Sequence, residues 1–345
     1  MKESRMAVRM IALLSLQHML VDFLCAYGLY HDTSLPFAGY VIYNFLAFVL
    51  QLPFGILADR LTERNHDRLL SSVMMVLAGT MLTMAGSWYA PVMAGLGNAL
   101  FHVGGGILAI REDDRSGFKG AALGVFVAPG ALGLLFGRLL SGSAAYVPVK
   151  IAVCVIMMLI SMLIINCYGR NRMAYRQPEE RTAGKALIVA LLCFAVVTMR
   201  SLVGMAVSFS WKTTTLLTIL SVVCVAGGKM LGGIIAARVG IRKTMIISLL
   251  TAFAGFLAGN NVIGGLLALL SFNMSMPLTL YLMARVMPDQ PGAAFGLLTV
   301  ALYVGWLPVA YGYASSLPPL LGAVCSLVSL AALLPAVRMC KDDLE

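Results

Sequence analysis

Two pairs of polar residues lie in otherwise apolar segments, at a spacing that lets them act together. His18 and Asp22 are four residues apart, and so are Asn98 and His102. Residues at i and i+4 share one face of a helix. Asp22 is the only acidic residue inside any long apolar segment, where an ionisable group is costly and marks a functional site. We therefore predict that Asp22, assisted by His102, takes up and releases protons.

Further polar residues fall in other apolar segments, and each also has a structural interpretation. Arg200 and Lys229 could bind an anionic group, or could extend their charged ends to the membrane interface. Asn273 could contact a ligand, or could hydrogen-bond between helices, and Trp306 could form part of an aromatic wall or simply pack. We predict a substrate-binding set of His18, Asn98, Arg200, Lys229, Asn273 and Trp306.

The elements that must position these residues are membrane-spanning helices. Of the 345 residues, 60% are hydrophobic and only 12% are charged, whereas a soluble domain carries about 25% charged residues. Segments of about 20 apolar residues are long enough to cross a bilayer. The expected spans are 7–30, 35–57, 69–88, 90–110, 120–140, 146–168, 185–210, 213–237, 243–259, 261–284, 292–314 and 317–337.

The net charge of +10 is explained by membrane orientation rather than by binding to nucleic acid. Most of the 25 Lys and Arg residues fall on one side when the spans alternate, as the positive-inside rule predicts. We expect both termini in the cytoplasm and, from the short outer loops, a multi-pass protein of a bacterial cytoplasmic (inner) membrane. The seven cysteines are scattered without a C-x-x-C pair, so no disulfide framework or zinc site is expected.

The chain divides into two comparable halves. The longest polar interval, 168–185, separates six expected spans from six others. We predict a six-helix bundle over 1–169, a cytoplasmic linker over 170–184 and a second six-helix bundle over 185–345. The segment after the second span reads GILADRLTER from Gly55, and the one after the eighth reads GIIAARVGIRK from Gly233. Two such segments at equivalent places indicate an internal repeat.

These segments resemble the cytoplasmic loop signature of the major facilitator superfamily, approximately G-x-L-A-D-R-x-G-R-[RK]. The first copy matches through Gly55, Asp59 and Arg60 but has Thr62 at the second Gly. The second copy has Ala237 at the acidic position. The resemblance implies an all-α membrane protein of twelve helices in two pseudo-symmetric halves. It also implies a gating loop formed by Gly55, Asp59, Arg60, Gly233, Arg238 and Gly240.

The same resemblance places the first, fourth, seventh and tenth spans around a central cavity, and the polar residues described above lie mostly on those spans. Residues 124–133, with Pro129 in register, are also similar to an element of the antiporter branch. We therefore expect a proton-coupled secondary transporter that moves a small organic solute, which could be anionic, by alternating access. Efflux is slightly favoured over uptake.

Two alternatives remain open. Asp22, His18, His102 and Met274 offer carboxylate, imidazole and thioether groups, which suit a transition-metal ion transporter. A receptor that binds its ligand without moving it is the other alternative. We expect no enzyme, because no nucleophile–base pair or dense metal constellation is present in the sequence. We also expect no cofactor and no nucleic-acid partner. The expected partners are the lipid bilayer, protons and a small-molecule substrate, and the chain is expected to be a monomer.

Overall fold

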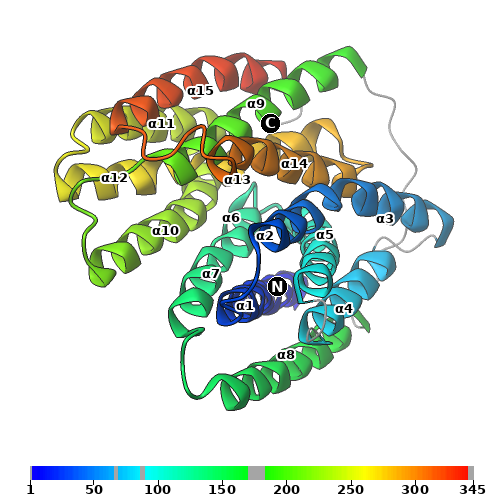
Figure 1. Ribbon diagram of the computed structural model, residues 1–345. Coiled ribbons are helices and arrows are strands. Elements are labelled where there is room, and N and C mark those ends of the chain that lie inside the picture. The colour runs from blue at the N-terminus through cyan, green and yellow to red at the C-terminus, as the bar shows by residue number, and fades with distance from the viewer. Residues whose placement is uncertain (1, 66–68, 86–89, 170–182, 341–345) are drawn as a thin grey trace. The chain divides into compact units, whose positions relative to one another are not determined.

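The computed structural model describes residues 2–65, 69–85, 90–169 and 183–340. Within this part of the chain the structure is almost entirely helical (Figure 1). The helices are α1 (Lys2–His31), α2 (Phe37–Asn44), η1 (Phe45–Val49), α3 (Gln51–Asn65), α4 (Leu70–Ala85), α5 (Ala90–Ser116), α6 (Ala121–Val127), α7 (Pro129–Leu140), α8 (Tyr146–Gly169), α9 (Ala183–Ala206), α10 (Thr215–Val239), α11 (Ile241–Leu257), α12 (Val262–Asn273), α13 (Ser275–Val286), α14 (Pro291–Ala310) and α15 (Pro319–Met339).

The expected all-α membrane fold is confirmed. Ten helical segments among the described residues are long and apolar enough to cross a membrane, counting α2–η1–α3, α6–α7 and α12–α13 as one passage each. The other two expected spans are the shorter helices α4, with 16 residues, and α11, with 17. The predicted linker over 170–184 lies almost wholly outside the described residues.

Three of the membrane passages are interrupted, two of them next to proline. The α6–α7 passage breaks at Ala128, directly before Pro129, and α12 ends at Asn273, four residues before Pro277. Proline has no N–H, and its ring collides with the carbonyl of the residue four positions earlier. In the second passage the interruption is η1, a π-helical turn. Such turns insert one extra residue into a helix.

Two compact units make up the chain. The first contains Met1–Gly117, Val125–Pro178 and Asp289–Gly296, and the second contains Phe118–Gly124, Glu179–Pro288 and Leu297–Glu345. The first unit therefore includes the start of α14, and the second unit includes the start of α6. The rest of each of these helices belongs to the other unit.

Close helix contacts in the first unit depend on small residues, most clearly where α1 packs against α7. A Cβ atom built on Gly133 would lie 2.1 Å from the carbonyl oxygen of Met19, so only glycine fits. Small residues at helix interfaces let backbones approach in this way within membranes. Glycine allows equally close contacts in the second unit, where a Cβ atom on Gly228 would lie 2.0 Å from the carbonyl oxygen of Leu270.

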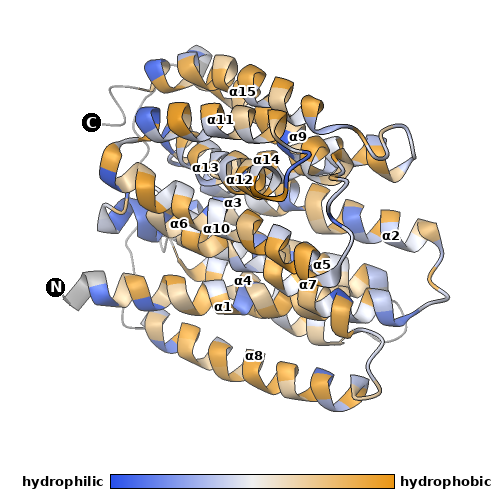
Figure 2. Ribbon diagram, turned by 90° about the vertical axis from the view of Figure 1, so that its left-hand side faces the viewer, coloured by the Kyte–Doolittle hydropathy of each residue, from blue (hydrophilic) through white to orange (hydrophobic). Residues whose placement is uncertain are grey.

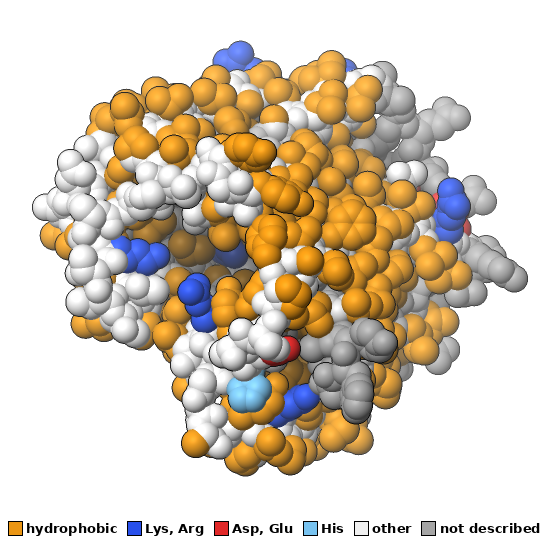
Figure 3. All heavy atoms as spheres, viewed as in Figure 1, with side chains coloured by type: hydrophobic (Ala, Val, Ile, Leu, Met, Phe, Trp, Pro, Cys, Tyr) orange, Lys and Arg blue, Asp and Glu red, His pale blue; other side chains and the backbone are white. Residues whose placement is uncertain are grey.

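The outward faces of the helices are suited to lipid. α8 is almost uniformly apolar (Figure 2), and its side chains Val147, Ile151 and Met162 are each about 60% exposed or more. On the face drawn in Figure 3, hydrophobic side chains cover most of the surface and charged ones are few. In water this arrangement would be unfavourable, whereas in a bilayer it needs no covering partner.

Candidate functional site

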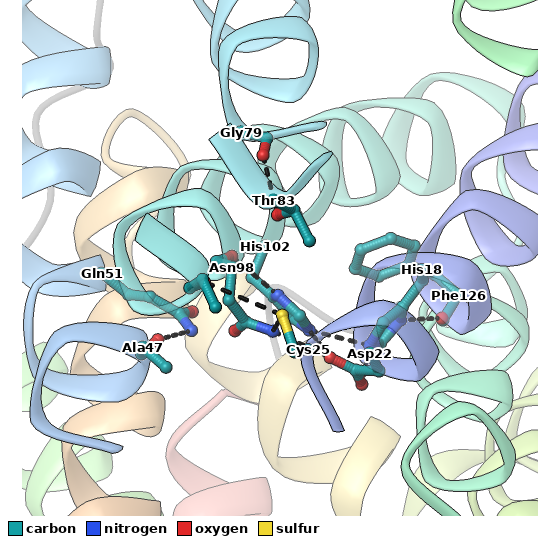
Figure 4. Close-up of polar contacts among 11 residues, drawn as sticks. His18, Asp22, Cys25, Ala47, Gln51, Gly79, Thr83, Asn98, His102 and Phe126 are labelled. Carbon is teal, nitrogen blue, oxygen red and sulfur yellow. Dashed lines mark hydrogen bonds and ion pairs between the residues drawn. The ribbon is translucent and has the colours of Figure 1, made fainter. Parts of the chain in front are cut away.

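The two helical pairs singled out in the sequence come together in the first unit. α1 carries His18 and Asp22, α5 carries Asn98 and His102, and the two helices pack against each other. Asp22, His18 and Asn98 are buried, and the His102 side chain is 12% exposed. Figure 4 shows the four side chains converging. We call these four residues the α1–α5 cluster.

The Asp22 carboxylate lies at the centre of the α1–α5 cluster. The side-chain N–H of Asn98 donates to its Oδ1 at 2.9 Å. His18 Nε2 lies 3.2 Å from Oδ2, and His102 Nε2 lies 3.6 Å from Oδ1. The two Nε2 atoms are 2.8 Å apart. A buried carboxylate surrounded in this way has groups that can stabilise its charge and exchange a proton with it.

The backbone fixes both imidazole rings. Nδ1 of His18 lies 2.8 Å from the carbonyl oxygen of Phe126, and Nδ1 of His102 lies 2.8 Å from that of Asn98. Phe126 is the penultimate residue of α6, where the α6–α7 passage is about to break. The helix interruption therefore supplies one of the contacts that orient the cluster.

Apolar groups and one close backbone enclose the α1–α5 cluster. The buried rings of Phe101 and Phe126 lie 6.1 and 5.0 Å from the His18 ring, between centroids. A Cβ atom on Gly130 would lie 2.4 Å from His18 Nε2 and 2.5 Å from Asp22 Oδ2. Gly130 thus lets the start of α7 close directly over the two side chains, a contact that the sequence did not reveal.

Three of these side chains could hold a metal ion. His18, Asp22 and His102 each offer one ligand atom, and the three atoms lie within 4.8 Å of one another. Two imidazoles and a carboxylate form a donor set that transition metals use. Met274, the fourth residue of the metal set expected from the sequence, belongs to the second unit, where its backbone packs against Gly232.

Arg200 is the outstanding polar residue of the second unit. It lies on α9 among the buried residues Val196, Val197 and Val203, and is itself only 7% exposed. Its guanidinium makes no hydrogen bond or ion pair with any residue that the structure describes, and its Nε atom is fully buried. An unpaired buried cation is unfavourable, so this position is suited to an anionic ligand.

The other predicted binding residues of the second unit are less distinctive. Lys229 is half-buried on α10, where its backbone carbonyl faces Gly124. The Asn273 side chain donates to the Leu269 carbonyl of its own helix at 2.8 Å, so this contact is local. Trp306 is half-buried with its ring 5.5 Å from that of Tyr303.

The expected first gating loop is helical, because α3 continues through Asn65 and includes Gly55, Asp59 and Arg60. Asp59 and Arg60 therefore lie inside a helix rather than after its end. Asp59 is buried, and its Oδ1 and Oδ2 accept hydrogen bonds from the N–H groups of Gly292 at 3.0 Å and Ala293 at 2.9 Å. These N–H groups belong to the first turn of α14, so the carboxylate caps a helix N-terminus within the first unit.

Gly55 makes that capping contact possible, because a Cβ atom there would lie 2.1 Å from the Gly292 carbonyl oxygen. Arg60 is exposed and has no partner among the described residues.

The second repeat segment has a related arrangement without the carboxylate. Gly233 lies within α10 and packs against the backbone of Gly120. A Cβ atom built on Gly233 would lie 2.4 Å from the carbonyl oxygen of Gly120. Arg238 is exposed in the last turn of α10. Gly240 separates α10 from α11 with a φ of 92°, a conformation that favours glycine.

Sequence reasoning missed several buried polar groups. Glu112 and Asp113, near the end of α5, are 0% and 2% exposed, and Glu112 Oε2 lies 2.6 Å from Arg115 Nη2. The run of five charged residues at 111–115, Arg-Glu-Asp-Asp-Arg, was the available signal, but the basic residues there were interpreted only as orientation signals. Cys25, whose thiol lies 3.8 Å from the Asn98 side-chain nitrogen, was also overlooked.

Comparison with solved structures places this arrangement in a known fold. The fucose:proton symporter FucP of E. coli superposes with a TM-score of 0.61 at 15% identity, over 95% of this chain and 98% of that one. FucP in an outward conformation gives 0.63 at 16% identity, over 96% and 99%. The human organic anion transporter MFSD10 gives 0.66 at 14% identity, also over 96% and 99%.

The chain has the fold of the major facilitator superfamily. The resemblance inferred from the repeated segments is therefore confirmed at the level of the fold. No model of a known protein family matches the sequence, and no curated protein sequence matches it. For a major facilitator fold recognised through such distant likeness, the activity must be argued from this chain's own residues.

Proposed function

We propose that the protein is a proton-coupled secondary transporter that moves a small organic solute by alternating access. The observation that carries the proposal is the buried Asp22 carboxylate, held by Asn98 and two imidazoles inside a membrane-spanning unit. A fucose:proton symporter and an organic anion transporter among the structural neighbours support the transport part. Resemblance of residues 124–133 to an antiporter element favours efflux.

The proposed coupling follows from linkage between protonation and conformation. A proton can drive transport only if it binds one access state more tightly than the other. The α1–α5 cluster can provide such a dependence, because Asp22 lies on α1 while Asn98 and His102 lie on α5, so a small displacement between the two helices changes both of their distances to Asp22. We propose His102, the most exposed member, as the residue through which protons reach Asp22.

For the solute we propose an anionic group bound at Arg200. The buried guanidinium without a described partner is the supporting observation. Arg200→Ala is expected to remove binding of a carboxylate-bearing solute, while Arg200→Lys retains part of it. Equal affinity of the wild type and Arg200→Ala for charged solutes, measured by thermal shift, would exclude this role.

The coupling proposal is tested with Asp22→Asn in proteoliposomes. We expect transport driven by a pH gradient to be abolished and solute exchange without a gradient to persist, because a permanently neutral side chain imitates protonated Asp22. Asp32→Asn is the matched control, since Asp32 is an exposed carboxylate just beyond the same helix. Gradient-driven transport at the wild-type rate in Asp22→Asn would refute the coupling role.

A transition-metal ion as the transported species is the second candidate, and the three converging ligand atoms of His18, Asp22 and His102 favour it. Metal-dependent thermal stabilisation together with uptake of Zn²⁺ or Mn²⁺ into proteoliposomes would support it over an organic solute. A ligand that stabilises the protein but never enters the vesicles would instead indicate a receptor.

We also propose that both termini face the cytoplasm of a bacterial inner membrane, as the distribution of cationic residues indicates.

A further inference from the structure

The second unit is nearly free of acidic residues. Residues 181–341 include a single carboxylate, that of Asp289, and this residue belongs to the first unit. Lysine and arginine recur throughout the same interval. Among the lysines and arginines that the structure describes in the second unit, only Arg200 is buried. No carboxylate of the second unit within this interval can therefore neutralise its charge.

The acidic residues that precede this interval lie too far from Arg200 along the chain. Positions 179 and 180 come shortly before α9, which begins at Ala183. Arg200 lies about 26 Å further along that helix, at about 1.5 Å per residue. The chain between residue 180 and α9 spans at most about 10 Å even when it is fully extended. Neither carboxylate can bridge the difference.

The acidic residues that follow the interval belong to the opposite end of the second unit. Residues 342–345 come after α15, which ends at Met339. The other end of α15 is held near Arg200, because the Leu317 N–H donates to the Ala206 carbonyl at 2.7 Å. Arg200 is about 9 Å from Ala206 along α9, whereas α15 extends about 30 Å towards Met339. No described carboxylate of the first unit pairs with Arg200 either, so its counterion must be a bound anion.

A second observation also indicates a bound acceptor. Among the described residues of the second unit, three fully buried side-chain atoms have no hydrogen-bond partner: Arg200 Nε and Thr198 Oγ1 on α9, and Ser329 Oγ on α15. The two helices pack against each other, and all three atoms can donate. Hydroxyl groups inside helices can donate to the carbonyl four residues earlier, as Ser326 does to Gly322 at 2.7 Å. The unmet requirement of these two helices is therefore for an acceptor.

The charge at this position fits a monovalent anion. Arg200 is the only charged residue of α9, α13, α14 and α15 that lies away from the helix ends. Lys185 lies in the first turn of α9, and Arg285 and Arg338 lie in the last turns of α13 and α15. One buried positive charge is neutralised by one negative charge, and a divalent anion would leave an excess. The guanidinium fork can hold both oxygens of a carboxylate, and the same N–H groups can converge on a halide ion.

We infer that Arg200 keeps an exchangeable monovalent anion, a halide when no solute is bound, and that a carboxylate of the solute binds by displacing it. Burying a guanidinium without a counterion is strongly unfavourable, so one anion replaces another at this position. Release of the solute on one side of the membrane is then followed by a return step that carries the halide. This inference deepens the proposed anion site, and it rests on the proposed function only for displacement by the solute.

Halide binding can be measured without knowing the solute. In purified protein, sodium sulfate is replaced stepwise by sodium chloride at constant ionic strength while the Tm is followed. A ligand that binds only the folded state raises the Tm in a saturable way. We expect such a chloride-dependent rise in the wild type and its loss in Arg200→Gln. Lys185→Gln is the matched control, because it removes the same charge from an exposed position of the same helix and should keep the rise.

The same chloride dependence in Arg200→Gln and in the wild type would overturn the inference, as would a wild type that does not respond to chloride. If Arg200→Gln does not fold, Arg200→Lys takes its place. Lysine keeps the charge but replaces the guanidinium fork by a single ammonium group, so the chloride midpoint should shift several-fold. An unchanged midpoint in Arg200→Lys would contradict binding at this side chain.

Acetate serves as the carboxylate probe for displacement. Bound chloride broadens the chloride-35 NMR line, and we expect acetate to remove the part of this broadening that depends on Arg200. If chloride binds through Arg200 but acetate does not displace it, the proposed carboxylate role fails and the halide site stands. If acetate binds through Arg200 and chloride does not, the halide inference is wrong and the proposed solute site is unaffected.

Discussion

Replacing Asp59 by Asn should release the first turn of α14. The carboxylate accepts two backbone hydrogen bonds, from Gly292 and Ala293, at 3.0 and 2.9 Å. Asparagine has a similar shape but only one accepting oxygen, and its NH₂ group would face the second backbone N–H. The substitution therefore loses one hydrogen bond to a charged group, leaves one N–H unsatisfied and removes the negative charge at a helix N-terminus.

The size of the effect can be worked out from these contacts. A hydrogen bond to a charged group contributes about 1.5–3 kcal/mol, and a charge at a helix N-terminus contributes about 0.3–1 kcal/mol. The sum is about 2–4 kcal/mol for local opening of the turn. Since 1.4 kcal/mol corresponds to a factor of ten, opening should become roughly 30- to 800-fold more frequent.

Amide hydrogen exchange measures this opening directly, because protection reports the free energy of local unfolding. Faster exchange is expected at Gly292 and Ala293 in Asp59→Asn. Arg60→Gln is the matched control, since Arg60 is the next residue but is exposed and has no described partner. We also expect slower transport with solute affinity nearly unchanged. Unaltered exchange at both amides would refute the capping role of Asp59.

Two further predictions concern packing and orientation. Gly133→Ala would place a Cβ atom 2.1 Å from the Met19 carbonyl oxygen, so it should destabilise the first unit by about 1–3 kcal/mol and lower the Tm. Gly142→Ala is the control and should leave the Tm unchanged, because no atom lies within 4 Å of the added Cβ atom. Equal Tm values for the two variants would show that α1 and α7 are not tightly packed. Reporters active only outside the cytoplasm should be silent when fused at positions 62, 115, 176, 241 or 288 and active at 33, 143 or 315, and the reverse pattern would overturn the proposed orientation.

Much of the α1–α5 cluster could be predicted because helical periodicity is regular. Once the spans were identified, the spacing of four residues placed His18 with Asp22 and Asn98 with His102. The requirement to satisfy a carboxylate in hydrocarbon then favoured bringing the two pairs together. The resemblance to a superfamily with repeated halves supplied the remaining step, from helices to fold.

Other features could not be predicted, because they depend on three-dimensional contacts between distant segments. Asp59 contacts amides that are 233 and 234 residues away in the sequence, and no local pattern identifies them. The Phe126 carbonyl that orients His18 is 108 residues away. Gly130 entered the sequence interpretation only as part of residues 124–133, which resemble an antiporter element, whereas its contact with His18 and Asp22 depends on how α7 packs against α1.

The separation of the cluster along the chain also affects how the protein is made. The span that carries His18 and Asp22 is synthesised before α5, in which Asn98 follows Asp22 by 76 residues. At about 5–20 residues per second, roughly 4–15 seconds pass between the synthesis of Asp22 and that of Asn98. During that interval the nascent α1 carries a carboxylate, which disfavours membrane insertion by about 2.5–3.5 kcal/mol, without Asn98 or His102 to stabilise it. Contact with Asn98 and His102, which offsets this cost, becomes available only when α5 emerges from the ribosome.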